Sequence, residues 1–157
     1  MKKVVRLVVT LLFVSFFLCS SVVLAEDTIK IGVQAPITGQ FAYEGQGMVK
    51  ASTLIIEQLN AKGGILGKKL ELFTCDDEGA PMKAAICAKD LVSKGAVAVV
   101  GAYTSACAMA IQETYQRANV TFASATSNND LTERGFWTFI RSCIPNEAHS
   151  AFAAEYM

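Results

Sequence analysis

The sequence is poor in the residues that metal sites and nucleophilic enzymes depend on. Its 157 residues include one histidine, His149, and none of its five cysteines belongs to a CxxC pair. Structural zinc sites need several Cys or His ligands at short spacings, so we expect no metal site. Ser105 is flanked by Thr104 and Ala106 rather than by the glycines of a hydrolase nucleophile elbow, and His149 has no evident partner. We therefore expect no catalytic residue and a protein that is not an enzyme.

A complete glycine fingerprint for a dinucleotide is missing as well. Gly45 and Gly47 match the first two glycines of GxGxxG, but Lys50 stands where the third is required. The fingerprint also follows its strand directly, whereas about a dozen residues separate Gly45 from the nearest preceding strand pattern. We expect no nucleotide and no other cofactor, and a nucleotide-dependent enzyme with a Rossmann-like sheet is kept only as an alternative function.

Charged residues are missing from one long stretch, residues 7–25, which follows a basic segment at residues 2–6. The stretch is largely apolar and ends in small or compact residues at positions 23–25, which is the layout of a secretory signal peptide. A retained membrane anchor is the alternative, because an uncharged stretch of this length just spans a bilayer. We expect cleavage of residues 1–25, export to the periplasm without stable membrane insertion afterwards, and a mature domain at residues 26–157.

An excess of basic residues is also lacking. The sequence has 14 Lys and Arg against 14 Asp and Glu. Removal of residues 1–25 takes away three basic residues and no acidic one, which leaves 11 against 14 and a net charge of −3. Proteins that bind nucleic acid need a clustered basic face, so nucleic acid is not an expected partner.

What the sequence does have is a regular alternation of strand and helix patterns. Met48, Ala51, Ile55 and Leu59 recur at helical spacing, and residues 96–101 form the continuous apolar run of a strand buried on both faces. Such alternation predicts an α/β fold, a Rossmann-like doubly wound parallel sheet with helices on both faces. The expected strands are residues 29–33, 70–73, 96–101, 120–123 and 137–141, and the expected helices are residues 45–60, 81–94, 105–118 and 146–157.

Ligands of such sheets bind beyond the carboxyl ends of the strands, near the switch in strand order. This rule selects the loops at residues 36–45, 102–106 and 124–130. In the second loop, Ser105 begins a helix, and two roles stay open: binding an anion at the helix N-terminus, or capping the helix. In the third loop, residues 125–129 offer hydroxyls and amides, although an ordinary solvated turn is the favoured interpretation.

An acidic group, Asp76, Asp77 and Glu78, follows the second predicted strand. These carboxylates could attract the ammonium group of a ligand. We favour a solvated acidic turn that helps to start the helix at Pro81, because negative charge is stabilising at a helix N-terminus.

Four cysteines lie beyond the predicted signal peptide: Cys75, Cys87, Cys107 and Cys143. An exported protein can form disulfides, and four cysteines allow three full pairings. Cys87 lies within a helical pattern and best fits a buried free thiol.

Short blocks of sequence occur in a fixed order along residues 29–157. They are Ile29-Lys30-Ile31-Gly32, residues 36–39, residues 59–68, Asp76-Asp77 with Pro81, Val99-Val100-Gly101 followed by Ser105, and residues 131–136 with Ile140-Arg141. In this order the blocks resemble the periplasmic branched-chain amino acid-binding proteins. The stretch NAKGGILGKKL and the sequence of blocks are far more specific than any single motif.

The resemblance implies a type I periplasmic-binding fold, in which two Rossmann-like lobes close on a ligand. Family members are more than twice as long, so residues 26–157 are expected to form most of the first, N-terminal lobe, in truncated form. The implied function is the extracytoplasmic solute-binding component of an ABC transporter. Its implied partners are a small amino-acid-like ligand, branched-chain or amide-like, and the ABC transporter permease subunits. A ligand-sensing domain of a receptor or regulator is the alternative with the same fold.

The resemblance also implies which residues bind the ligand. In the family, the first lobe holds the α-carboxylate and part of the ammonium group of the amino acid. The serine after the third strand corresponds to Ser105. The hydroxyl after the fourth strand corresponds to Ser127, with Thr126 as the neighbouring alternative, and backbone groups near Tyr103 and Ala125 are expected to assist.

Two positions depart from the family pattern. The aromatic residue that usually walls the side-chain pocket corresponds to Glu44, and an unpaired buried carboxylate suits an aliphatic ligand poorly, so a polar or cationic amino acid, an amide or another small solute is expected. A frequent family cysteine corresponds to Thr104, so the usual disulfide does not carry over. We expect a Cys107–Cys143 disulfide, because both residues follow strands near one edge and bridged Cα atoms must lie within about 7 Å.

Overall fold

The structure is a computed structural model that describes residues 28–157. The predicted signal peptide, residues 1–25, lies outside the described residues. Within the described part, no helix is both long enough and apolar enough to cross a membrane.

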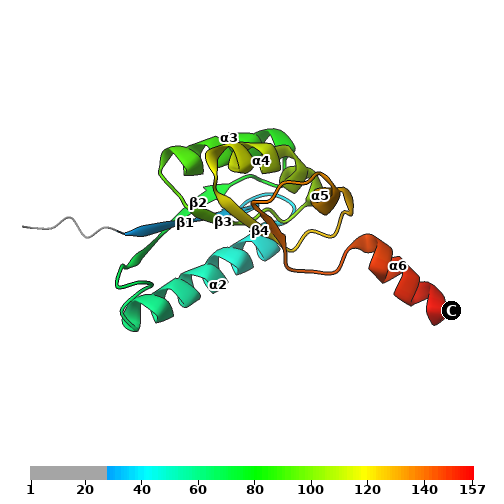
Figure 1. The fold of residues 1–157 in the computed structure, drawn as a ribbon, viewed down its shortest axis with the longest axis horizontal. Helices are drawn as coiled ribbons and strands as arrows, with labels where there is room; N and C mark the ends of the chain where they lie inside the picture. Colours follow the sequence, from blue (N-terminus) through cyan, green and yellow to red (C-terminus); the bar gives the residue numbers. More distant parts are fainter. Residues whose placement is uncertain (1–27) are drawn as a thin grey trace, which may run out of the picture.

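The fold is a five-stranded parallel sheet with helices on both faces (Figure 1). The strand order is β2-β1-β3-β4-β5, so the chain steps to one side of β1 and then to the other. This confirms the α/β, doubly wound parallel sheet that the sequence predicts. The strands are β1 (Ile29–Ala35), β2 (Leu70–Asp76), β3 (Ala98–Gly101), β4 (Thr121–Ser124) and β5 (Phe139–Arg141); the helices are α2 (Ala42–Ala61), α3 (Pro81–Ser93), α4 (Ser105–Ala118), α5 (Asp130–Glu133) and α6 (Asn146–Glu155).

The core lies between the sheet and the helix pair α3 and α4, which cover the same face (Figure 1). Small residues on both helices, Ala84, Ala88 and Ala108, are fully buried and let the helices pack closely. Larger side chains fill the remaining space, and burial of each contributes about 1.5–3 kcal/mol. The largest apolar side chains among them are Leu91, Ile111, Tyr115, Phe122 and Leu131.

The opposite face of the sheet is only partly covered. Helix α2 packs over β1 and β2, while apolar side chains of the other strands stay open to solvent. Val100 of β3 is 41% exposed and Ile140 of β5 is 54% exposed. Strands of parallel sheets are normally buried on both faces, so this half of the sheet is apolar without a cover among the described residues.

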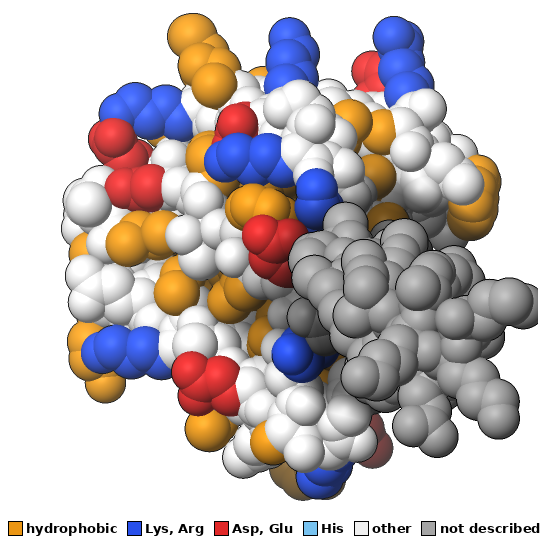
Figure 2. All heavy atoms as spheres, turned by 90° about the vertical axis from the view of Figure 1, so that its left-hand side faces the viewer, with side chains coloured by type: hydrophobic (Ala, Val, Ile, Leu, Met, Phe, Trp, Pro, Cys, Tyr) orange, Lys and Arg blue, Asp and Glu red, His pale blue; other side chains and the backbone are white. Residues whose placement is uncertain are grey.

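Helix α6 extends away from the sheet (Figure 1). All of its residues are exposed, including Phe152, whose ring lies 4.7 Å from that of Tyr156 between centroids. The other end of the lobe, where β1 begins and α2 ends, carries basic and acidic side chains interspersed with apolar ones (Figure 2).

The disulfide of the structure joins Cys75 at the end of β2 to Cys87 in α3, with a Cα–Cα distance of 5.6 Å. The expected Cys107–Cys143 pair is wrong, and so is the expectation of a free thiol at Cys87. Cys107 is a buried free thiol in the core, and the Cys143 thiol donates to the carbonyl of Ala125. A short turn takes the chain from β2 directly back along α3, which brings Cys75 and Cys87 together although one is in a strand and the other in a helix.

Loss of this disulfide should lower the free energy of unfolding. In the Cys75→Ser/Cys87→Ser variant, the unfolded chain is no longer cross-linked, and we expect a loss of about 2–4 kcal/mol in urea unfolding. Cys143→Ser is the control and should change stability by less than about 0.5 kcal/mol. Equal unfolding curves for the double variant and the wild type, or a non-reduced digest without a Cys75–Cys87 peptide, would contradict the assignment.

Candidate ligand-binding site

The carboxyl ends of β1, β3 and β4 bring three loops to one edge of the sheet. The strand order reverses between β1 and β3, so this edge is the place where doubly wound sheets bind their ligands. We call it the ligand edge. Gly101 lets the strands meet closely here, because a Cβ atom at this position would lie 1.9 Å from the carbonyl oxygen of Gln34. Gly45 lets the first turn of α2 lie close to the loop that follows β1, since a Cβ atom at this position would lie 2.0 Å from the carbonyl oxygen of Pro36. This close packing explains why residue 45 is a glycine, although Gly45 also matches the first glycine of a dinucleotide fingerprint.

The N-terminus of α4 carries the first candidate group. The capping residue is Thr104, whose hydroxyl accepts a hydrogen bond from the Cys107 amide at 3.3 Å. The interpretation of Ser105 as the cap is therefore wrong, and Ser105 is the first helical residue. Within residues 28–157, the Ser105 hydroxyl and the amides of Ser105 and Ala106 have no hydrogen-bond partner. These groups form an unsatisfied helix N-terminus, which attracts anions.

The loop after β4 carries the second group. The Ser124 hydroxyl donates to the carbonyl of Ala102 at 3.0 Å and contacts the Thr126 hydroxyl at 3.0 Å. Thr126 is 3% exposed, so its hydroxyl points into the protein. The Ser127 side chain is half-buried and has no hydrogen bond within the described residues, so of the two alternatives it is better placed to meet a ligand.

Arg141 fixes this loop, a role that sequence reasoning missed. Its guanidinium donates to the carbonyls of Asn128 at 2.8 Å and Asn129 at 3.2 Å, and to the Thr132 hydroxyl at 2.9 Å. The amide of Asn146 also donates to the carbonyl of Ser127 at 2.8 Å. The loop is therefore held from inside by a cation, and the interpretation as an ordinary solvated turn is wrong.

A cavity of about 570 Å³ opens between α2 and the ends of β3 and β4. Two of the predicted site residues, Tyr103 and Ala125, line it. Met48 and Ile55 of α2 line it on the helix side, and Val100 lines it from the partly uncovered face of the sheet. Glu44 does not line the cavity; it lies half-buried in the first turn of α2.

The acidic turn after β2 is part of the protein framework rather than a solvated turn. Asp77 is fully buried: one carboxylate oxygen accepts from the Gly79 amide at 2.9 Å and the other from the Gln34 amide group at 3.3 Å. Gln34 in turn accepts from the Tyr115 hydroxyl at 2.7 Å. Burial, with a smaller contribution from neighbouring Asp76, raises the pKa of Asp77. Because protein donors occupy its oxygens, Asp77 is not directed at a ligand ammonium group.

Comparisons with known proteins identify the family and agree with the fold. The family described as "Periplasmic binding protein" matches residues 28–156. The Leu/Ile/Val-binding protein BraC3 of Rhizobium johnstonii is 33% identical over 135 residues, which are 85% of this chain and 37% of that protein.

Two solved structures share the fold. The branched-chain amino acid transporter substrate-binding protein LivJ of Streptococcus pneumoniae, in complex with isoleucine, has a TM-score of 0.72 at 30% identity, covering 76% of this chain and 34% of LivJ. A solute-binding protein of Rhodopseudomonas palustris, in complex with 3,4-dihydroxybenzoic acid, has a TM-score of 0.69 at 25% identity, covering 76% of this chain and 33% of that one. The chain thus spans little more than a third of the length of the relatives it matches.

The buried carboxyl of Asp77 should give stability a distinct pH dependence. Its pKa in the folded protein is raised above the unfolded value of 3.8. The stability that Asp77 provides is therefore full below the unfolded pKa and is lost as the pH rises through the folded pKa. We expect Asp77→Asn, which cannot ionise, to gain stability relative to the wild type in urea unfolding as the pH rises from the unfolded pKa through the raised folded pKa. A difference between the two proteins that stays constant over this range would contradict the burial of an ionisable group.

Proposed function

We propose, because this chain belongs to the periplasmic binding protein family, that it forms part of the first lobe of an extracytoplasmic solute-binding protein serving an ABC transporter. The proposed ligand is a small solute with a carboxylate, in the first place a branched-chain or similar amino acid. Two relatives support the solute class, since one is named a Leu/Ile/Val-binding protein and another is solved with isoleucine.

The observation that carries the proposal is the unsatisfied N-terminus of α4 at the ligand edge of the sheet. Helix N-termini favour anions through their free amides and the helix dipole. The ligands of the two structural relatives, isoleucine and 3,4-dihydroxybenzoic acid, have little in common except a carboxylate. A lobe that recognises the carboxylate leaves the rest of the cleft to select the side chain.

We assign the ligand contacts accordingly. Ser105 and Ser127 offer free hydroxyls, and the backbone near Tyr103 and Ala125 lines the adjoining cavity. Thr126, whose hydroxyl is engaged with Ser124, supports the loop from inside. Glu44 stays a prediction as a residue that influences ligand preference, through its place in the first turn of α2.

The serine assignment predicts a loss of affinity for L-leucine in the full-length protein. Hydrogen bonds to a charged group contribute about 1.5–3 kcal/mol each, so Ser105→Ala or Ser127→Ala should weaken binding roughly ten- to a hundredfold in calorimetry. Because Thr104 caps α4, Ser105→Ala keeps the cap, and its melting temperature should stay close to that of the wild type.

Ser93→Ala is the matched control for the serine variants. Among the described residues, the Ser93 hydroxyl donates only to the Asp90 carbonyl, at the end of α3 away from the ligand edge. The affinity of this variant for leucine should therefore equal that of the wild type. Serine variants that bind leucine as tightly as this control would show that the carboxylate is held elsewhere.

Export is the second consequence of the proposed function. The layout of residues 1–25 predicts cleavage after Ala25. Expressed in a bacterium with two membranes, the protein should be recovered from the periplasm with Glu26 as its first residue in N-terminal sequencing. A membrane-bound product that keeps Met1 would contradict the signal peptide and would favour a retained anchor.

A further inference from the structure

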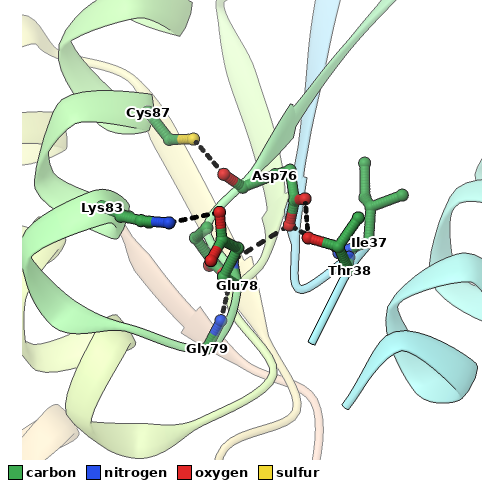
Figure 3. Close-up of polar contacts among 8 residues, drawn as sticks. Ile37, Thr38, Asp76, Glu78, Gly79, Lys83 and Cys87 are labelled. Atoms are coloured by element: carbon green, nitrogen blue, oxygen red, sulfur yellow. Dashed lines mark hydrogen bonds and ion pairs between the residues drawn. The ribbon is translucent and has the colours of Figure 1, made fainter. Parts of the chain in front are cut away.

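The carboxylate of Asp76 joins two loops at the ligand edge (Figure 3). It lies at the end of β2, yet it accepts hydrogen bonds from the loop after β1. One oxygen accepts from the amides of Ile37 at 2.8 Å and Thr38 at 3.3 Å, and the other accepts from the Thr38 hydroxyl at 2.5 Å. A single side chain thus fixes two consecutive residues of the β1–α2 loop.

The turn that carries Asp76 is itself held by several further contacts. Its first oxygen also accepts from the Glu78 amide at 2.9 Å, which closes the turn on itself. Asp77 holds the next residue through the Gly79 amide, and Glu78 forms an ion pair with Lys83 of α3 (Figure 3). The disulfide beginning at the preceding residue, Cys75, fastens the end of β2 to α3.

Three residues after Thr38 in the same loop, the ring of Phe41 lies against the turn after β2, at Gly79. A Cβ atom at Gly79 would lie 2.9 Å from the Phe41 ring, so glycine is needed for the ring to rest there. The Phe41 ring also contacts Tyr103, with ring centroids 5.2 Å apart and the planes tilted by 47°. Tyr103 directly precedes the cap of α4 and lines the cavity.

We propose that Asp76 is a positioning residue for ligand capture. By anchoring Ile37 and Thr38, it holds Phe41 against Tyr103 and so keeps the segment that leads into α4 in its binding geometry. The choice of ligand rests on the proposed function, whereas the anchoring of the loop and of the ring pair does not.

The chemistry of an ionised carboxylate suits this role. Hydrogen bonds to a charged acceptor are stronger than those between neutral groups, and the two oxygens of Asp76 accept four of them. Partial burial acts to raise the pKa of Asp76, but the hydrogen bonds from Thr38, Glu78 and Ile37 outweigh it and lower the pKa below its usual value. The carboxylate is therefore charged at neutral pH. An asparagine offers one acceptor oxygen in its place, and an alanine offers none.

The test compares four variants of the full-length protein: Asp76→Ala, Asp76→Asn, Thr38→Val and the control Asp90→Ala. Asp90 forms an exposed ion pair with Lys94 beyond the other end of α3. Three properties are measured: amide exchange at Ile37 and Thr38, the nuclear Overhauser effect between the Phe41 and Tyr103 rings, and the affinity for L-leucine.

We expect Asp76→Ala to speed exchange at both amides and to weaken leucine binding by about ten- to a hundredfold, with a weaker ring-to-ring signal. Asp76→Asn should fall between Asp76→Ala and the wild type in all three measurements. Thr38→Val keeps both amides and should have the smallest effect of the three, and Asp90→Ala should match the wild type. If Asp76→Ala does not fold, the proposal is tested by the other two variants. Asp76→Asn should then have larger effects than Thr38→Val in all three measurements, and the reverse order would contradict the proposal.

Several outcomes would overturn the inference. Unchanged exchange at Ile37 and Thr38 would show that Asp76 does not anchor the loop. Faster exchange with an unchanged ring signal and unchanged leucine affinity would show a purely structural residue. A wild-type protein that does not bind L-leucine would overturn the proposed ligand instead, and the ring signal would then decide the positioning role without it.

Discussion

The parallel pairing of β1 with β2 on one side and β3 on the other is the constraint from which the ligand edge follows. In this register Ala35 lies opposite Asp76, and Gln34 lies opposite Gly101. The first pairing puts the Asp76 carboxylate next to the loop that leaves β1. The second pairing brings two backbones so close that only glycine fits at position 101. Strand register therefore determines where the loops of the candidate site lie, apart from any contacts that the loop side chains make.

Beneath that edge, a buried polar network replaces part of the apolar core. Gln34, Asp77 and Tyr115 are fully buried and are linked through hydrogen bonds, with the Gln34 amide group also donating to the Ala84 carbonyl at 3.1 Å. Buried polar groups specify one arrangement when every member is satisfied. This network connects β1, the β2–α3 turn, α3 and α4, which are the elements that surround the ligand edge on its covered face.

The sequence predicts the fold well because hydrophobic spacing directly reflects burial. The expected strands at residues 96–101 and 137–141 both exist, although the strands of the structure begin only at Ala98 and Phe139. The disulfide could not be derived, since spacing does not show that Cys75 and Cys87 come within bonding distance. The cap at Thr104 was missed by one residue, because hydroxyls at neighbouring positions are indistinguishable without backbone angles. The acidic turn was misread because the sequence shows the carboxylates but not the amides they accept from; its Asp-Asp-Glu-Gly pattern was the available signal.

The proposed function depends on the N-terminus of α4 holding the carboxylate of a small ligand. The most direct measurement is a crystal structure of the full-length protein with L-leucine. We expect the leucine carboxylate within hydrogen-bond distance of the Ser105 hydroxyl and of the free amides of Ser105 and Ala106. A leucine molecule bound with its carboxylate away from α4, or an empty cleft at saturating leucine, would contradict it.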